Sequence, residues 1–295
     1  MNTIVYFGMY FLLGLLAFFP LDWLYLLSDL LFYPLYYLIR YRRRLTRRNL
    51  LNAFPDADLK SVVSIEKQFY RHFCDCFFET VKLLHISDEE MKRRFVFNNI
   101  KLLEDRMQNG NSCLMLLGHY GNWEWVTSIT LWSSDPETRF AQVYRPLKNK
   151  ASNRFFLKLR TRFHSVGFEK NAVLREIVKM RKEGVKSMIG FISDQKPSGN
   201  NMHYWTQFLN QETSVLTGVE RIARQTGFLV AYLDVRKVKR GYYEADIQLI
   251  TDDPKSVAEY EITEQYIRAL EQTILRQPAY WLWTHNRWKY QKTVK

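Results

Sequence analysis

The sequence contains few cysteines and histidines, the residues from which proteins build disulfides and many metal sites. Its three cysteines, Cys74, Cys76 and Cys113, do not form a disulfide framework and indicate a reducing compartment. The Cys74-x-Cys76 spacing is not that of a zinc site, and the six histidines are scattered. No G-x-S-x-G pattern marks a serine nucleophile. We therefore predict neither a metal nor a bound cofactor.

Acidic residues are also scarce relative to basic ones. The chain of 295 residues has 43 Lys and Arg against 30 Asp and Glu, a net charge of +13. Such an excess points to an anionic partner, which is a nucleic acid, a membrane surface or an acidic protein or substrate. Aromatic residues make up 16% of the chain. Basic and aromatic residues together suit a lipid headgroup region or single-stranded nucleic acid.

Long apolar segments occur at the N-terminus. Residues 3–21 carry no charge, and residues 23–39 are apolar except at Asp29 and Pro34. A bilayer span needs about 20 mainly apolar residues, so the first segment suffices for a transmembrane helix. The second segment also suits an interfacial position. A signal peptide is disfavoured because no basic residues precede the segment and no small-residue cleavage site follows it. A buried core hairpin remains an alternative.

A run of arginines follows these segments directly, in "RYRRRLTRRN" at residues 40–49. Positive residues beside an apolar segment stay on the cytoplasmic side and attract anionic headgroups. The run alone is also typical of a nucleic-acid patch, but its position favours a membrane and no nucleic acid. We predict an N-terminal membrane anchor with an interfacial segment over residues 1–44. Residues 45–295 are expected to form a domain on the cytoplasmic face of the inner membrane.

Apolar periodicity predicts alternating strands and helices in the rest of the chain. Short apolar runs predict strands at 113–118, 139–144, 187–193, 228–235 and 243–250. Helical spacing predicts helices at 59–85, 149–164, 171–183, 214–226 and 261–276. This alternation is typical of an α/β fold with a mostly parallel or mixed central sheet flanked by helices. The last two strands, joined by a short basic turn, are expected to pair antiparallel.

Polar residues follow three of the predicted strands. His119, Arg145 and Asp194 each lie just past a strand, and in such folds ligands bind beyond the carboxyl ends of the strands. Arg145 also fits a structural ion pair, and Asp194 a strand-end cap. We expect the three side chains to form one site.

The stretch "LLGHYGNWEW" at residues 116–125 pairs His119 with Glu124. If a helix begins near Gly121 or Asn122, with Asn122 as its N-cap, the Glu124 carboxylate can fold back onto the imidazole. A carboxylate on one ring nitrogen raises the basicity of the other and makes a general base for an alcohol. A hydrogen-bonded structural histidine is the alternative.

Several sequence blocks resemble one enzyme family. "LLGHYGNWEW" is similar to the H-x4-[DE] box of glycerolipid acyltransferases, and its G-H-x-G-N-W-E form resembles the late (lauroyl and myristoyl) acyltransferases of lipid A biosynthesis. "NLLNAFPD" at 49–56, "QVYRPLKN" at 142–149, "GFISDQKP" at 190–197 and "QPAYWLWTHNRWK" at 277–289 resemble further family blocks in the family's order. The segment after Asp194-Gln195 departs from the family's phenylalanine-rich pattern, which leaves the acyl chain and the acceptor open.

The resemblance implies an O-acyltransferase with a glycerolipid acyltransferase-like fold. An acyl-carrier-protein thioester would be the co-substrate, and acyl carrier protein, a lipid A precursor and inner-membrane lipids would be the partners. His119 would act as general base and Glu124 would orient it. Arg145 and Asp194 would bind the acceptor or developing charge, with Asn122 and Gln195 as weaker substrate-binding candidates.

Two other functions remain open. The same chemistry is possible on a lysophospholipid, an aminolipid or a mannosylated phosphoinositide, with acyl-CoA as donor. The second alternative is that the chain is a non-enzymatic, membrane-tethered binder of anionic polymers. The terminal "WLWTHNRWK" (281–289) suits either a contact to lipid or the site, or tryptophans packed on the core.

Overall fold

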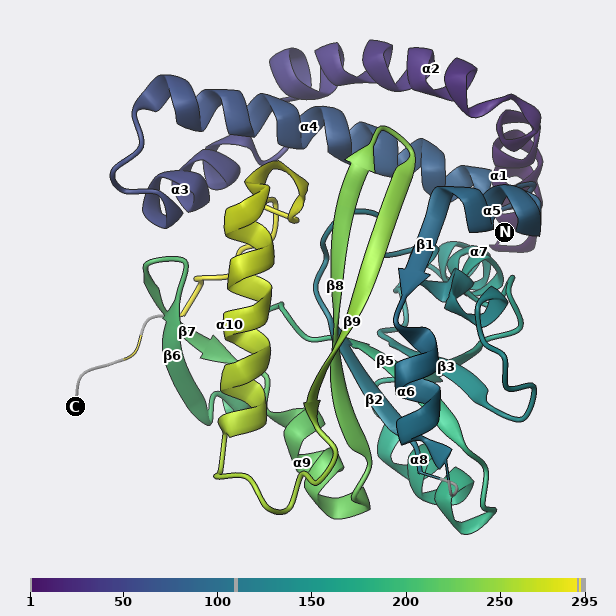
Figure 1. Ribbon diagram of the computed structural model, residues 1–295. Helices are drawn as coiled ribbons and strands as arrows, with labels where there is room; N and C mark the ends of the chain where they lie inside the picture. The colour runs from purple at the N-terminus through teal and green to yellow at the C-terminus, as the bar shows by residue number, and fades with distance from the viewer. Residues whose placement is uncertain (1, 109–110, 291, 293–295) are drawn as a thin grey trace.

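A seven-stranded sheet forms the centre of the computed structural model, which describes residues 2–108, 111–290 and 292 (Figure 1). Its strand order is β1-β9-β8-β2-β5-β3-β4. Neighbouring strands are parallel except for the antiparallel pair β8–β9. The strands are β1 (Phe95–Asn98), β2 (Cys113–Leu117), β3 (Arg139–Tyr144), β4 (Val166–Glu169), β5 (Ser187–Ile192), β8 (Leu229–Lys239) and β9 (Tyr242–Thr251). The predicted mostly parallel sheet and its antiparallel pair are confirmed.

Helices cover both faces of the sheet because the crossovers run in opposite directions along it. Helix α7 (Lys150–Arg160) leads from β3 outward to β4, whereas α8 (Val173–Lys182) leads back to β5 and α9 (Gly218–Thr226) leads on to β8. Right-handed crossovers then place α7 on one face, called the first face, and α8 and α9 on the second face. The first face also carries α4 (Leu59–Lys82) and the 3₁₀ helix Trp125–Leu131, in which Trp125 Nε1 donates to the Glu79 carbonyl of α4. The second face carries α10 (Glu261–Arg276).

The predicted helices are confirmed, and several short elements were missed. Helix α4 begins where Asp58 accepts a hydrogen bond from the Ser61 backbone N–H at 2.6 Å, a typical N-cap. The helix expected from residue 214 begins only at Gly218, because the hairpin strand β7 extends to Val215. The elements without a sequence prediction are α3 (Arg43–Ala53), α5 (Asp88–Arg94), β1, α6 (Ile100–Arg106), β4, β6 (Tyr204–Phe208) and β7 (Gln211–Val215).

The N-terminal segment folds as α1 (Asn2–Phe18), α2 (Leu21–Tyr33) and a π-helical continuation at Pro34–Ile39. Within the described residues, no one helix is both long and apolar enough for a membrane span. Tyr10–Phe18 and Leu21–Ile39 reach that threshold together, but the chain bends by 119° between them. Length and composition thus give only weak support for the predicted membrane-anchoring helix.

Helix α2 lies along α4 and is joined to it by buried hydrogen bonds (Figure 1). Tyr25 Oη donates to Glu79 at 2.9 Å, and Ser28 Oγ donates to Asp75 at 2.7 Å. The opposite side of the N-terminal helices is rich in exposed apolar side chains, among them Phe11, Leu12, Leu15, Phe18, Trp23, Leu26, Leu30, Leu38 and Ile39. The segment therefore has one side fixed to the domain and one apolar side facing outward.

The arginine run is used partly inside the molecule. Arg43 and Arg47 both bind the buried carboxylate of Glu66, at 3.2 and 2.8 Å. Arg42 donates to the Thr284 carbonyl at 3.0 Å. The expectation that the whole run faces anionic headgroups therefore does not hold for these three arginines, which bind groups elsewhere in the fold.

Candidate active site

The predicted strand-end residues come from three adjacent strands, since β2, β5 and β3 are neighbours in the sheet. His119 follows β2 and Asp194 follows β5, and the two side chains meet. His119 Nδ1 lies 2.6 Å from Asp194 Oδ1, and the His119 backbone N–H donates to Oδ2 at 2.8 Å. The carboxylate therefore fixes both the imidazole and the backbone that carries it.

Asp194 is almost fully buried and accepts a further hydrogen bond from Trp281 Nε1 at 2.8 Å. Burial by itself would raise the pKa of Asp194. The attraction of His119, with the hydrogen bonds from His119 and Trp281, outweighs burial and lowers the pKa to about 2. Asp194 is consequently an anion near neutral pH, so the ring nitrogen that faces it, Nδ1, donates to the carboxylate, and Nε2 is the ring nitrogen that faces away from Asp194.

Gln195 lies at that second ring nitrogen. Its side-chain nitrogen is 3.3 Å from His119 Nε2, in agreement with Nε2 as the acceptor. Trp123 packs against the imidazole edge-on, with ring centroids 5.3 Å apart. Gln195, predicted as a candidate for substrate binding, thus lies beside His119 Nε2, and both residues line the same cavity.

The expected contact between His119 and Glu124 is wrong. The Glu124 carboxylate accepts two hydrogen bonds from Arg160, from Nε at 2.8 Å and from Nη2 at 2.6 Å. The chain after His119 forms a turn followed by a 3₁₀ helix that begins at Trp125, not an α-helix from Gly121, so Glu124 points toward the end of α7. Asp194, from a distant part of the chain, takes the place predicted for Glu124.

The turn after His119 is shaped by Gly121 and Asn122. Gly121 has a φ of +59°, and a Cβ there would lie 3.0 Å from Val235, so this position requires glycine. Asn122 accepts from the Trp125 backbone N–H at 3.1 Å, as the predicted cap, and donates to buried Glu79 at 2.7 Å. Asn122 therefore holds the turn from behind and does not line the cavity, unlike its prediction as a substrate-binding residue.

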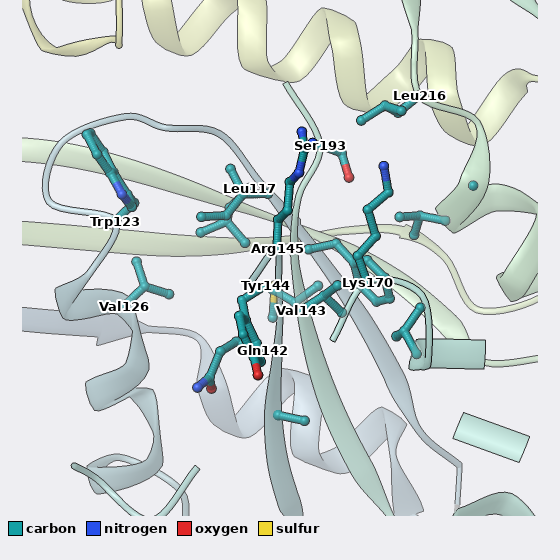
Figure 2. Close-up of a pocket in the computed structure, with 18 of the residues that line it drawn as sticks. Leu117, Trp123, Val126, Gln142, Val143, Tyr144, Arg145, Lys170, Ser193 and Leu216 are labelled. Carbon is teal, nitrogen blue, oxygen red and sulfur yellow. The ribbon is translucent and has the colours of Figure 1, made fainter. Parts of the chain in front are cut away.

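A cavity of about 870 Å³ opens beside His119, in the upper range of pockets for drug-sized ligands. Glu124 is the one acidic side chain among the described residues that line it, and it is paired with Arg160. Four more cations line the cavity without forming an ion pair with any carboxylate that the structure describes: Arg145, Lys170, Lys196 and Arg221. The cavity thus presents a net positive lining. Figure 2 shows Arg145 and Lys170 within it.

Arg145 lies at this cavity, but it does not pair with Asp194, which is held by His119 and Trp281. The alternative that Arg145 forms a structural ion pair finds no support in the described contacts. Its charge remains available to a ligand.

The C-terminal segment completes the site. Trp281 and Trp283 are buried, and Trp281 forms a β-bridge with Tyr120 besides its bond to Asp194. Asn49 of α3 donates to the carbonyls of Trp283 and His285, both at 3.0 Å, which ties the "NLLNAFPD" block to this segment. Both readings of the terminal tryptophans hold in part, since they pack in the core and one of them reaches the site.

Two important contacts were not predicted. Arg160 occurs in a helix without a motif, so nothing in the sequence marked it as the partner of Glu124. The role of Trp281 was hidden among several aromatic residues. Over residues 2–108, 111–290 and 292, no group of three His, Cys, Asp or Glu side chains is placed to hold a metal ion.

Comparison with known families gives one match. The sequence model of a family described as bacterial lipid A biosynthesis acyltransferase matches residues 1–290. A search of curated proteins found no match.

Proposed function

Because the chain belongs to the bacterial lipid A biosynthesis acyltransferase family, we propose that it transfers a fatty acyl chain from an acyl-carrier-protein thioester to a hydroxyl of a lipid A precursor. The observation that carries this proposal is the His119–Asp194 pair beside a cavity with a positive lining. No bound cofactor takes part, and the acyl thioester is a co-substrate.

His119 serves as the general base. Its Nε2 takes the proton of the acceptor hydroxyl while Asp194 stabilises the imidazolium that forms. The acceptor oxygen attacks the thioester carbonyl carbon and forms the new C–O bond. The C–S bond then breaks, and the leaving thiolate takes the proton from His119. Proton, electron pair and leaving group are balanced without a nucleophilic serine or cysteine.

The cations of the cavity bind the anionic parts of the substrates. A lipid A precursor carries phosphates and acyl carrier protein is acidic, so unpaired Arg145, Lys170, Lys196 and Arg221 suit both. Arg145 follows β3 directly and supplies positive charge to the acceptor phosphate or to the developing oxyanion. Gln195 orients the hydroxyl at His119 Nε2.

Glu124 acts through Arg160 in this proposal. The bidentate pair lines the cavity next to His119, and a paired guanidinium is held in one orientation. Glu124 is thus a positioning residue for Arg160, while Asp194 positions His119.

The exposed apolar side of α1 and α2 attaches the protein to the inner membrane. Contiguous exposed apolar surface of this kind marks a membrane or partner site. The hydrogen bonds from Tyr25 and Ser28 hold the other side of α2 on the domain, which favours a helix lying in the interface. The catalytic domain is then on the cytoplasmic face, where acyl carrier protein is found.

Mass spectrometry of lipids tests the proposal. Cells without the gene are complemented with the wild-type chain, with His119→Ala, or with the exposed-residue control His203→Ala. We expect one additional acyl unit on lipid A with the wild type and the control, and none with His119→Ala. If lipid A is unchanged and the acylation of lysophospholipids, aminolipids or phosphoinositides changes instead, the lipid A precursor is not the acceptor. Function that persists in His119→Ala but fails on arginine substitution would favour a non-enzymatic binder.

A further inference from the structure

The cavity beside His119 extends to both faces of the sheet. Consecutive strand residues point to opposite faces, and both Gln142 and Val143 of β3 line the cavity. Figure 2 shows Gln142 and Val126 to one side of β3, and Val143 and Lys170 to the other. The cavity therefore has two compartments that meet past the carboxyl ends of β3 and β5, next to His119.

The two compartments differ in chemistry. The first-face compartment lies between the sheet and the 3₁₀ helix. Gln142 and the mutually paired Glu124 and Arg160 line part of it, and its deep part is apolar, with Met115, Ile129, Phe140 and Met188. The second-face compartment lies against α8 and α9 and carries Lys170 and Arg221 beside valines and an isoleucine. An uncharged hydrocarbon chain fits the first, and an anionic group fits the second.

Gly190 lies in the middle of the first-face compartment. It is in register with Met115 of β2 and Gln142 of β3, so all three face the same side of the sheet. Gly190 is only half-buried although β5 is a central strand, because the cavity reaches its backbone. A Cβ there would meet nothing closer than the Ala141 carbonyl oxygen at 3.8 Å and Leu117 Cδ2 at 3.9 Å.

The backbone does not require glycine at this position. Gly190 does not have the positive φ that Gly121 has, and a glycine inside a strand is less stable than alanine, because it loses more conformational freedom on folding. The missing side chain instead leaves open the path between the site and the deep apolar walls. Gly190 precedes Asp194 by four residues, which corresponds to about 13 Å along an extended chain.

We propose that the first-face compartment holds the acyl chain of the donor and that Gly190 sets the length of chain admitted; this inference rests on the proposed acyl transfer. The thioester carbonyl lies at His119, and the chain runs back along β5 over Gly190. The methyl end of a long chain lies between Met115 and Met188, whose flexible side chains adapt to it. A side chain at position 190 blocks the passage, so the site then accepts only shorter chains.

The test is a competition among saturated acyl-carrier-protein thioesters of graded length, with the full-length chain in detergent and products identified by mass spectrometry. We expect Gly190→Val to lower the ratio of the longest to the shorter accepted chains by about tenfold or more, and Gly190→Ala to lower it less in the same direction. Val143→Phe adds comparable bulk to the second-face compartment and is expected to leave this ratio unchanged.

The outcomes separate the inference from the proposed function. Transfer by the wild type with unchanged preference in both Gly190 variants overturns the length assignment alone. A shift caused by Val143→Phe instead overturns the choice of compartment. Absence of transfer by the wild type overturns both proposals. If the valine variant does not fold, as judged by its thermal melt, the alanine variant decides, because its added methyl meets only ordinary contacts.

Discussion

Two histidines of this protein lie at the same loop, since His119 is part of it and His72 contacts its Gly121 carbonyl, yet their surroundings differ. His119 binds Asp194 through Nδ1 and turns Nε2 toward the cavity. His72 is enclosed, with Nδ1 3.1 Å from Lys237 Nζ and Nε2 3.2 Å from the Gly121 carbonyl oxygen. Burial and the nearby Lys237 charge lower the pKa of His72 well below its usual value. A base needs a ring nitrogen that a substrate can reach. Of the two histidines, only His119 lines the cavity.

The largest effect should come from removing each histidine in turn. His119→Ala loses the base, and we expect acyl transfer by the folded protein to fall by about 10³-fold or more. The substitution also removes a partner of the buried Asp194 carboxylate, so some loss of stability accompanies it. His72→Ala leaves Lys237 and the Gly121 carbonyl without this partner, and it should cost about 2 kcal/mol or more of stability. The acyl-transfer rate per folded molecule checks the first prediction, and the free energy of unfolding from urea denaturation checks the second. If His72→Ala were fully stable and still lost acyl transfer, His72 would not be the structural residue that this comparison takes it to be.

The acids can be compared by double-mutant cycles. Asp194→Asn should reduce transfer by about 10²- to 10⁴-fold, because the amide no longer stabilises the imidazolium. Glu124→Gln should reduce it less, and combining it with Arg160→Gln should add little, since the two side chains form one unit. Combining Glu124→Gln with Asp194→Asn should instead multiply the losses. Additive losses for Glu124 and Arg160 would contradict the assigned pairing.

The smallest effect concerns pH and stability. Because the pKa of His72 is lowered by folding, the unfolded chain binds more protons below about pH 6.5, and stability falls as pH falls below that value. His285, whose pKa burial lowers to about 4, acts in the same direction. Relative to wild type, His72→Gln should lose stability less steeply on acidification, by up to about 1.4 kcal/mol per pH unit. Urea denaturation of both proteins near pH 7 and pH 5 measures this difference in the free energy of unfolding. An equal pH dependence in wild type and His72→Gln would argue against a neutral, enclosed His72.

The sequence predicted the fold and the strand ends better than the contacts between them. The long apolar runs such as β2 and β5 were found because burial on both faces leaves a clear pattern. The strands β1 and β4 have only four residues each, which is too short for their pattern to stand out. His119 and Asp194 were both identified, but their pairing was not.

That failure has a physical reason. Glu124 is close to His119 in sequence, whereas Asp194 is 75 positions away, and local spacing favours the nearer acid. Which acid meets the imidazole is decided by the neighbouring positions of β2 and β5 and by the turn after Gly121. Neither is visible in the residue pattern. The location of residues 1–44 as a separate anchor stays a prediction.

The carboxylate of Glu79 accepts hydroxyl donors from Tyr25 on α2 and Tyr243 on β9, and it also accepts from Asn122 behind the histidine loop. A shortened chain without α2, made to avoid detergent, would open this carboxylate to water and loosen the support of the loop. It would also uncover the apolar surface of α4 that α2 now shields. Trimming the protein to improve its behaviour in solution would therefore weaken the very part that performs the chemistry.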